Sequence, residues 1–164
     1  MTVMLRAGRP EDAEELGRIC YAAFTRISGA HNFPPDWPSV EMAQMVMAAL
    51  LKRPDVHHVV AERDGRLVGS NFMAESGAIG GIGPITVDPA VQDGAIGRAM
   101  MEHMLGVAER DGLPGVRLVQ AAFHSRSMAL YAKLGFVVRE PLACLQGAPP
   151  GRRLAGFPVR PARA

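Results

Sequence analysis

Residues 87–100 read VDPAVQDGAIGRAM, and the fold expected for the rest of the chain follows from them. An apolar segment leads through Asp-Pro into a glycine-containing turn, and a helical pattern of apolar residues comes next. A strand, a glycine turn and a helix start in this order favour a bound phosphate, because the free N–H groups and the dipole of a helix N-terminus attract anions. The centre of the turn, Asp93-Gly94-Ala95, nevertheless places an acid and a methyl group where a base and a bare glycine would suit a phosphate better.

The elements around this turn form a β-α-β unit. Residues 79–87 predict a strand, about 93–111 a helix, and 116–122 a second strand that we expect to run parallel to the first with a right-handed crossover. Ligands of open α/β sheets bind at the carboxyl ends of strands, so the glycine turn falls in the expected cleft. Pro84 lacks the N–H that a sheet ladder needs, and it predicts an edge, a bulge or an irregular end in the first strand.

The other elements follow from turn and capping signals. Pro10 opens a helix that ends near Ser28, and Ser39 can cap a second helix. Asp-Gly between two apolar runs, at positions 64 and 65, predicts a β-hairpin. The remaining expected elements are strands at residues 3–8, in the two arms of the hairpin within 56–76, at 136–147 and, as a candidate, at 152–161, with a short helix at 125–135.

Apolar residues recur in the three long helical segments at the spacing of one helix face. We expect these stripes to pack against the sheet, with their methionines as core residues rather than as part of a cofactor site. The stripes are Leu16, Ile19, Cys20, Ala23 and Phe24; Met42, Met45, Val46, Ala49 and Leu50; and Ile96, Met100, His103, Met104 and Val107.

The composition is that of one soluble globular domain spanning residues 1–164. Apolar residues make up 48% of the chain and the net charge is +2, with the basic residues scattered, so no nucleic-acid partner is expected. No apolar run approaches the roughly 18 residues of a membrane helix, and the N-terminus is unlike a signal peptide, so we expect no membrane partner and a cytoplasmic location. Cys20 and Cys144 lie far apart, and His57 and His58 point to opposite faces of one strand, so no metal site is expected.

Two stretches together resemble a known family. They are ITVDPAVQDGAIGRAMMEHML, residues 85–105, and HSRSMALYAKLGFVVRE, residues 124–140, with a predicted strand between them. On these motifs and on the order of its elements, the chain resembles the GNAT superfamily of acyl-CoA-dependent N-acyltransferases. The resemblance implies a mixed α/β GNAT fold with a central twisted mixed sheet of about 6–7 strands and about four helices. It also implies a V-shaped gap between the strands near 79–87 and 116–122.

By this resemblance the glycine turn binds the pyrophosphate of acetyl-CoA, which serves as co-substrate without any metal. Backbone N–H groups would bind the phosphates with Arg98 adding positive charge, and the strand near 79–87 would offer its backbone to pantetheine. His124 stands where the family often has an Asn, and it either contacts the cofactor or caps the short helix with Ser125. Ala95 replaces the family's central glycine, so Ala95 and Asp93 leave the tightness of binding open. The implied cofactor-binding residues are Ile85, Thr86, Val87, Gln92, Asp93, Gly94, Ala95, Ile96, Gly97, Arg98 and His124.

The resemblance also implies a general acid. Tyr131 matches the tyrosine of the family signature, and a phenol with an ordinary pKa of about 10 can protonate a leaving thiolate at neutral pH. The alternative is a helix tyrosine that only packs. The general base stays open, because the strand at 79–87 carries no carboxylate, and an acceptor amine of low pKa needs no base. The candidates for the base are Glu75, which joins Tyr131 as a catalytic candidate, and His31, Asp36 and His124.

The loop HNFPPDWPS, residues 31–39, lies where the family commonly borders its acceptor site. Phe33 and Trp37 can form an apolar wall there and Asp36 can attract a cationic amine, so these three and His31 are the substrate-binding candidates. Proline-stiffened packing around a buried tryptophan is the alternative.

The function that the resemblance implies is transfer of an acetyl group from acetyl-CoA to a primary amine of a small molecule or peptide. The amine would attack directly, without a covalent enzyme intermediate. The alternative is a non-catalytic module that binds acyl-CoA or another metabolite, and a homodimer is left open.

Overall fold

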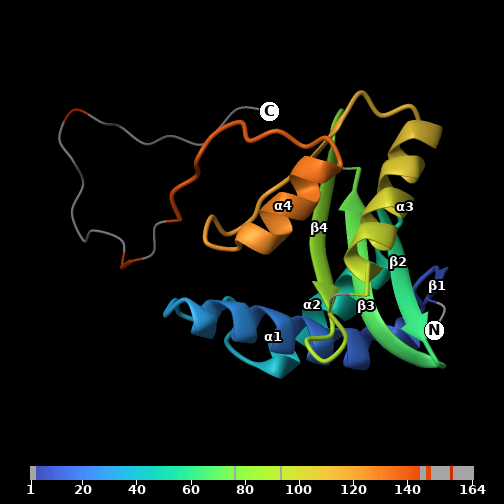
Figure 1. Ribbon diagram of the computed structural model, residues 1–164, viewed down its shortest axis with the longest axis horizontal. Coiled ribbons are helices and arrows are strands. Elements are labelled where there is room, and N and C mark those ends of the chain that lie inside the picture. Colours follow the sequence, from blue (N-terminus) through green and yellow to red (C-terminus); the bar gives the residue numbers. More distant parts are fainter. Residues whose placement is uncertain (1–2, 76, 93, 145–146, 149–155, 157–164) are drawn as a thin grey trace.

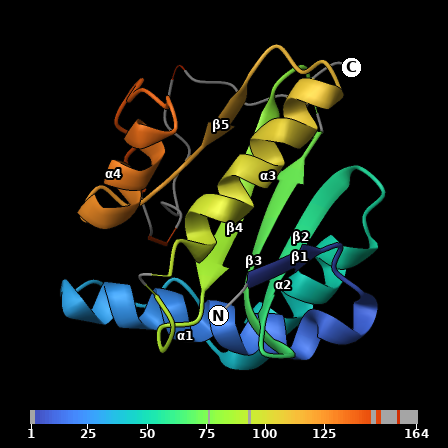
Figure 2. The same ribbon diagram turned by 45° about the vertical axis from the view of Figure 1, so that its right-hand side comes forward.

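The computed structural model describes residues 3–75, 77–92, 94–144, 147–148 and 156, and this part of the chain is built on one mixed β-sheet (Figure 1 and Figure 2). Strands β1 to β4 are antiparallel neighbours in chain order, and β5 joins β4 in parallel. The parallel pair confirms the expected β-α-β unit. The strands are β1 (Val3–Arg6), β2 (Val56–Arg63), β3 (Arg66–Ala74), β4 (Gly80–Val87) and β5 (Val116–Leu118).

Helices cover both faces of this sheet (Figure 2). One face carries α1 (Ala13–Ala30), which continues from a 3-10 turn at Pro10–Asp12, and α2 (Val40–Lys52). The other face carries α3 (Ile96–Arg110) and α4 (Ser125–Lys133). No helix in the described part of the chain is long and apolar enough to cross a bilayer.

Alternation along the central strands gives each face of the sheet its own core. On β2, Val59 and Ala61 pack toward α3, whereas Val60 between them packs toward α1 and α2. On β3, Met73 packs toward α3, whereas Phe72 packs toward α1 and α2. Successive side chains of a strand point to opposite faces, so a continuous apolar run fills both cores.

Local signals set several element boundaries as expected. Asp64 and Gly65 have positive φ angles of 53° and 73°, which is the conformation of the two-residue hairpin turn that Asp-Gly favours. The Ser39 side chain accepts a hydrogen bond from the Met42 N–H and caps α2. Gly135, at a φ of 90°, follows the end of α4. The predicted hairpin and cap are therefore confirmed, and the short helix lies within the expected residues 125–135.

β4 contains a β-bulge at Pro84. Ile85 lies opposite Asn71 of β3. Ile82 lies opposite Met73, so the stretch of β4 between these two pairs is one residue longer than the matching stretch of β3. A proline is tolerated at such a place because no ladder hydrogen bond from its nitrogen is required. The bulge was one of the positions that the sequence predicted for this proline.

The parallel pair of β4 and β5 opens toward the carboxyl end of β4. Pairing stops where Ile82 lies opposite Leu118, and β4 continues to Val87 with no described strand on that edge. This confirms the V-shaped gap expected between the strands near 79–87 and 116–122. An unpaired strand edge leaves backbone N–H and C=O groups for another partner.

The sheet has five strands among the described residues, fewer than the 6–7 that the resemblance implied. β5 ends at Leu118 instead of continuing to 122, and residues 136–144 form no strand, with Val137 and Val138 exposed. An apolar run becomes a strand only where a neighbouring strand pairs with it, and local sequence does not reveal the neighbour. Most of the candidate strand at 152–161 lies outside the described residues.

The apolar face predicted for α2 is wrong by one position. Met42 and Met45 are exposed, whereas Ala43, Met47 and Leu51 are buried. Nearly every residue in the second half of this helix is apolar, so periodicity alone did not fix which side faces the sheet.

The stripe predicted for α3 is correct except at His103. That side chain is exposed, and Met101 and Ala108 are buried in its place beside the expected Ile96 and Met104. The buried face of the helix also includes the row of Met101 and Ala108, so it is wider on that side than the predicted stripe.

Candidate active site

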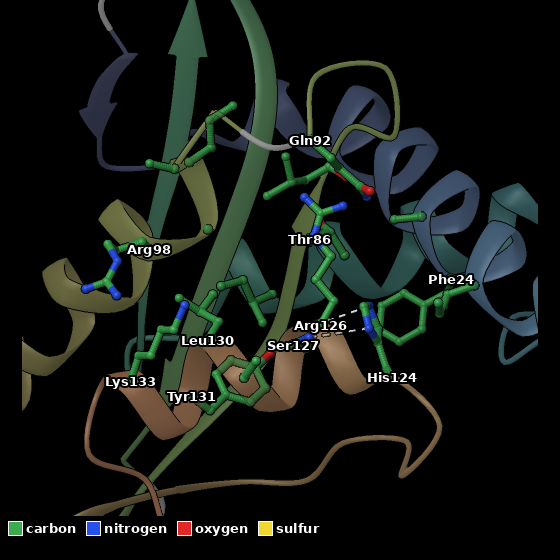
Figure 3. Close-up of a pocket in the computed structure, with 18 residues that line it drawn as sticks. Phe24, Thr86, Gln92, Arg98, His124, Arg126, Ser127, Leu130, Tyr131 and Lys133 are labelled. Carbon is green, nitrogen blue, oxygen red and sulfur yellow. Dashed lines mark hydrogen bonds between the residues drawn. The ribbon is translucent and has the colours of Figure 1, made fainter.

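A cavity of about 440 Å³ opens where the carboxyl end of β4 meets α1, α3 and α4 (Figure 3). This is the side of the sheet at which β4 and β5 part, and open α/β sheets bind ligands at such places. The cavity is therefore the candidate active site. Its lining residues are Ala23, Phe24 and Ile27 from α1; Ile85, Thr86 and Val87 from β4; Gln92, Ala95, Ile96, Gly97 and Arg98 from the turn and the start of α3; and His124, Arg126, Ser127, Ala129, Leu130, Tyr131 and Lys133 from α4 and its N-cap.

The first turn of α3 presents backbone N–H groups to this cavity. The first hydrogen bond of the helix runs from the Ala99 N–H to the Ala95 carbonyl, at 3.0 Å. The N–H groups of Ile96, Gly97 and Arg98 therefore have no partner within the helix, and no side chain of the N-cap residue covers them. These N–H groups and the positive end of the helix dipole favour an anion here.

Ala95 holds the turn in a conformation that glycine adopts more easily. Its φ of 57° and ψ of 9° lie in the left-handed region, where a Cβ atom costs roughly 1–2 kcal/mol. The side-chain amide of Gln92 donates to the Val87 carbonyl at 3.3 Å and helps to close this turn. Gly94 is exposed and does not line the cavity, and Asp93 lies outside the described residues. The helix start thus keeps its anion-binding shape without the family's central glycine.

The described lining of the cavity carries positive side chains and no negative ones. Arg98, Arg126 and Lys133 supply the basic groups, and the described lining includes no Asp or Glu. Arg98 also pairs with Glu102, from Nη1 to Oε1 at 3.0 Å, along the exposed side of α3. This charge distribution suits a phosphate-bearing ligand and adds to the effect of the helix start.

His124, Ser127 and Tyr131 form a row along α4 and its N-cap (Figure 3), and hydrogen bonds join the first two. The Ser127 N–H donates to His124 Nδ1 at 3.5 Å, and His124 Nε2 lies 3.1 Å from the Ser127 Oγ. With Nδ1 accepting, the proton of the neutral ring sits on Nε2 and is donated to that hydroxyl oxygen. Tyr131 follows in this row and also lines the cavity. His124 therefore both caps α4, as one of the two predicted alternatives had it, and lines the cavity.

Burial keeps both ends of this row in their neutral forms. It raises the pKa of Tyr131 above the ordinary value of 10.0, and the neighbouring Ser127 hydroxyl opposes this only in part. The pKa of His124 is lowered from 6.5, first by burial and then by the positive Arg126 and by His31. At neutral pH, Tyr131 is thus a protonated acid and His124 an uncharged imidazole.

Ile85, Thr86 and Val87 bring the open edge of β4 to the cavity. The Thr86 hydroxyl lies 3.3 Å from the Ser70 Oγ in the sheet interior, so it already has a partner. What this segment offers to a ligand is therefore the backbone of its unpaired edge, as the resemblance implied for pantetheine.

The structure does not bring Glu75 to this cavity. Glu75 follows Ala74, which lies opposite Gly81 near the start of β4, whereas the cavity lies at the other end of that strand. Its Oε1 is 2.8 Å from His57 Nε2. Glu75 is thus separated from Tyr131, the other catalytic candidate.

His31 and Phe33 form an aromatic stack beside the cavity. Their rings lie against Phe123, with centroid distances of 4.9 Å from His31 and 4.4 Å from Phe33. Phe123 directly precedes His124, which lines the cavity, although none of the three stacked residues does so. The first part of the loop at 31–39 therefore lies next to the cavity mouth.

Asp36 and Trp37, from the same loop, pack away from the cavity lining. Asp36 accepts a hydrogen bond from the Ser28 hydroxyl at 3.1 Å. The Trp37 ring meets Phe24 edge to face at a centroid distance of 6.2 Å. These are packing contacts, although Trp37 is only partly buried and not the buried tryptophan of the alternative, and Trp37 contacts the cavity lining at Phe24.

One wall of the cavity was not indicated by the sequence. Ala23, Phe24 and Ile27 line it, although the stripe that contains the first two was expected to belong to the core. α1 extends past the edge of the sheet (Figure 1), so its last turns face the cavity instead of the strands. Ser127 was missed as well, although its helical spacing from the two candidates on α4 could have found it.

Known proteins share this sequence pattern. The pattern of the Acetyltransferase (GNAT) family matches residues 23–136, a span that includes every residue lining the cavity. An IAA acetyltransferase from Azospirillum brasilense is 33% identical over 93 residues, which are 56% of this chain and 61% of that protein. A mycothiol acetyltransferase from Streptomyces avermitilis is 34% identical over 84 residues, which are 49% of this chain and 27% of that protein. The matched part is thus less than two thirds of either relative.

The fold is also shared with solved structures. A PaiA N-acetyltransferase from Thermoplasma acidophilum, solved in complex with coenzyme A, aligns with a TM-score of 0.75 over 86% of this chain and 93% of that one, at 16% identity. At this identity the likeness concerns the fold. Together with the family pattern over residues 23–136, it shows that the chain has the mixed α/β GNAT fold and belongs to the GNAT family of acetyltransferases.

Proposed function

We propose that this protein transfers an acetyl group from acetyl-CoA to a primary amine of a small molecule or peptide. The observation that carries the proposal is that one cavity joins the anion-attracting start of α3 to the protonated hydroxyl of Tyr131. A protein that uses an acyl-CoA thioester has to bind its phosphates and to protonate the thiolate that leaves. The two curated relatives are both named as acetyltransferases, which supports acetyl as the group that is moved.

Each part of the cavity would have its own task. The N–H groups at the start of α3, with the basic side chains of the lining, would hold the pyrophosphate. The open edge of β4 would hold the pantetheine arm by backbone hydrogen bonds. These contacts would fix the thioester near α4, and such positioning alone accounts for a large part of the rate in reactions of two bound groups.

Tyr131 would act as the general acid. The amine nitrogen forms a bond to the thioester carbon, the carbon–sulfur bond breaks, and the departing sulfur takes the phenolic proton. The position of Tyr131 in the cavity lining and its raised pKa support this role. The amine then loses its extra proton to solvent, and the phenol is restored from water.

The acceptor would enter the site as a neutral amine. Among the four candidates for the base, only His124 lines the cavity, and both of its ring nitrogens are already engaged with Ser127. At pH 7 roughly one in ten α-amino groups is neutral, against roughly one in several thousand lysine side chains. We therefore propose an α-amino group or a weakly basic aromatic amine as acceptor rather than a lysine side chain.

The aromatic stack supports a planar or apolar acceptor. Phe33 is 54% exposed although it stacks on Phe123, so one side of this pair is available to another molecule. His31 extends the same surface. An exposed aromatic face next to a cavity favours binding of flat groups.

Release of thiol from acetyl-CoA, measured at neutral pH with three acceptors, tests this proposal. The acceptors are a peptide with a free α-amine, an aromatic primary amine, and a peptide with a blocked α-amine and a free lysine. We expect acceptor-dependent release with one or both of the first two, and much slower release with the third. Faster release with the lysine peptide would contradict the proposal of a neutral acceptor.

A non-catalytic acyl-CoA-binding module is the second candidate. The observation that favours it is the lack of any carboxylate in the described lining, which leaves the site without an evident base. If acetyl-CoA binds but no amine in a broad panel releases its thiol, this second function replaces the first.

A further inference from the structure

Three side chains that can bind a metal converge far from the cavity. His57 lies near the start of β2, Glu75 follows the end of β3, and Asp111 is the C-cap of α3. None of them lines the cavity. α3 runs along the sheet (Figure 2). Its first turn lines the cavity, and Asp111 follows its last turn. We call them the His57 cluster.

The donor atoms of the His57 cluster lie close to metal-binding distances. His57 Nε2 is 2.8 Å from Glu75 Oε1 and 3.4 Å from Asp111 Oδ2, and one donor atom from each residue lies within 4.8 Å of the others. Ligand bonds of about 2.0–2.2 Å in a tetrahedral zinc site place neighbouring donors roughly 3.3–3.5 Å apart. The 3.4 Å separation of His57 and Asp111 matches this spacing, whereas the Glu75 carboxylate would have to shift away from the imidazole to admit an ion.

The backbone already holds these residues in place. The Glu75 N–H donates to the Asp55 carbonyl at 2.9 Å. The Asp111 N–H donates to the Val107 carbonyl at 3.0 Å, and His57 is fixed in the ladder between β2 and β3. A site whose ligands come from three anchored elements loses little conformational entropy when an ion binds.

The electrostatics of this place favour a cation. Among the described residues, no Lys or Arg forms an ion pair with Glu75 or Asp111, and the side chain in contact with both carboxylates is the imidazole of His57. Asp111 also lies at the C-terminal end of α3, where the helix dipole is negative. The three side chains are 28–38% exposed, so an ion can enter from solvent and keep a water ligand.

We propose that the His57 cluster binds one divalent transition-metal ion, with Zn²⁺ the best fit and water completing the coordination. An imidazole nitrogen with two carboxylate oxygens is a donor set that zinc accepts, whereas Mg²⁺ prefers oxygen ligands alone. The ion would link the start of β2, the end of β3 and the end of α3. Its role is to stabilise this end of the fold, and it takes no part in the reaction at the cavity.

A metal-free arrangement with the same contacts is the competing explanation. A protonated His57 between two carboxylates would also give short distances, as an exposed ion-pair group of small energetic value. The two explanations differ in the response to zinc, because only a metal site binds the ion saturably and through the imidazole.

Calorimetric titration of ZnCl₂ into untagged, metal-stripped protein without acetyl-CoA tests the proposal independently of the proposed function. We expect one ion per chain, a raised thermal unfolding midpoint and no comparable binding of MgCl₂. His57→Gln should weaken zinc binding by at least about tenfold. The matched control is His103→Gln, which removes an exposed histidine outside the cluster and should bind zinc like the unaltered chain.

Asp111→Asn repeats the test at an exposed helix end, away from the strands that a change at His57 can disturb. It too should weaken zinc binding by at least about tenfold. Absence of saturable binding to the unaltered chain would overturn the proposal. Equally tight binding to folded His57→Gln and Asp111→Asn would overturn it as well.

Discussion

The two ends of α3 differ in charge, in the kind of group that they offer and in the ligand that they suit. At its start, unpartnered N–H groups, Arg98 and the basic residues of α4 surround a cavity whose described lining holds no carboxylate. At its end, Asp111 joins Glu75 and His57 in a group that offers oxygen and nitrogen lone pairs. The helix dipole has the matching sign at each end, positive at the start and negative at the end. The two sites that we propose, one for an anion and one for a cation, thus lie at opposite ends of one helix.

The two ends of α3 also differ in the role that we propose for each, which is the reaction at the cavity and stabilisation of the fold at the His57 cluster. The cavity end contains a protonated phenol and a volume of about 440 Å³, which a substrate can fill. The other end is an open cluster with donors within 4.8 Å of one another, which leaves space for an ion but not for a cofactor. Changes at the cavity should therefore alter turnover, and changes at the His57 cluster should alter stability.

Loss of the Tyr131 hydroxyl should have the largest effect. Tyr131→Phe removes the general acid and should lower kcat by about 100-fold or more, with little change in acetyl-CoA affinity, as steady-state kinetics and calorimetry can measure. Tyr21→Phe is the matched control, because Tyr21 lies on α1 and does not line the cavity. Full turnover in Tyr131→Phe would show that this tyrosine is not the general acid. It would also contradict the catalytic role that we propose for this end of α3.

Relief of the left-handed residue at the start of α3 should have a moderate effect on stability. Ala95→Gly removes the methyl group from a residue at a φ of 57° and should raise the free energy of unfolding by roughly 0.5–1 kcal/mol in urea titrations. The same exchange one helical turn later, Ala99→Gly, should lower it by about 1 kcal/mol, because Ala99 has helical geometry. Changes of the same sign at both positions would contradict the assigned conformation.

The smallest expected effect is on the free energy of unfolding at acid pH. The folded pKa of His124 lies below 6.5, so below about pH 6.5 the unfolded chain takes up a proton that folded His124 resists. This residue therefore lowers the free energy of unfolding as the pH falls through that range and has no such effect at higher pH. His124→Asn removes the titrating group while keeping a good N-cap.

Urea unfolding from about pH 5 to about pH 8 checks this expectation. The variant should lose less stability than the unaltered chain on the acid side, and the two should differ by a constant amount above neutrality. The other histidines, including His103, are present in both proteins and cancel in the comparison. Parallel profiles over the whole range would show that burial does not hold His124 neutral.

The cavity end was predictable because its parts are continuous in the sequence. The turn at 85–98 and the helix at 124–133 each carry several site residues at fixed local spacing. Helix starts and helix faces are local features, so a strand–turn–helix pattern and a tyrosine signature indicate them directly. Ala95 was flagged from sequence as the unusual residue, and the structure gives it the left-handed conformation.

The cluster at the other end was not predictable, and the sequence favoured no metal site at all. His57, Glu75 and Asp111 are separated by long stretches of chain, and only the pairing of β2 with β3 and the packing of α3 bring them together. The argument that His57 and His58 cannot share a metal remains correct, because His58 instead accepts a hydrogen bond from the Gly8 N–H. The other two donors of the cluster, Glu75 and Asp111, come from the end of β3 and the end of α3.

Two further misses have the same physical origin. Residues 136–144 contain an apolar run without a strand partner, and the second half of α2 is apolar on nearly every side. In both segments the outcome depends on which neighbour is available rather than on the local pattern. The wall of the cavity formed by Phe24 likewise depends on how far α1 extends past the sheet.

Calorimetric titration with acetyl-CoA of the unaltered chain and of two glycine variants tests the central claim most directly. Gly97→Asp places a carboxylate in the first turn of α3, where it suits the helix but repels a phosphate, and Gly106→Asp places the same group on an exposed part of the same helix. We predict saturable binding to the unaltered chain, at least about tenfold weaker binding to Gly97→Asp, and little change for Gly106→Asp. No binding to the unaltered chain, or equal binding to folded Gly97→Asp, would contradict an acetyl-CoA site at the start of α3.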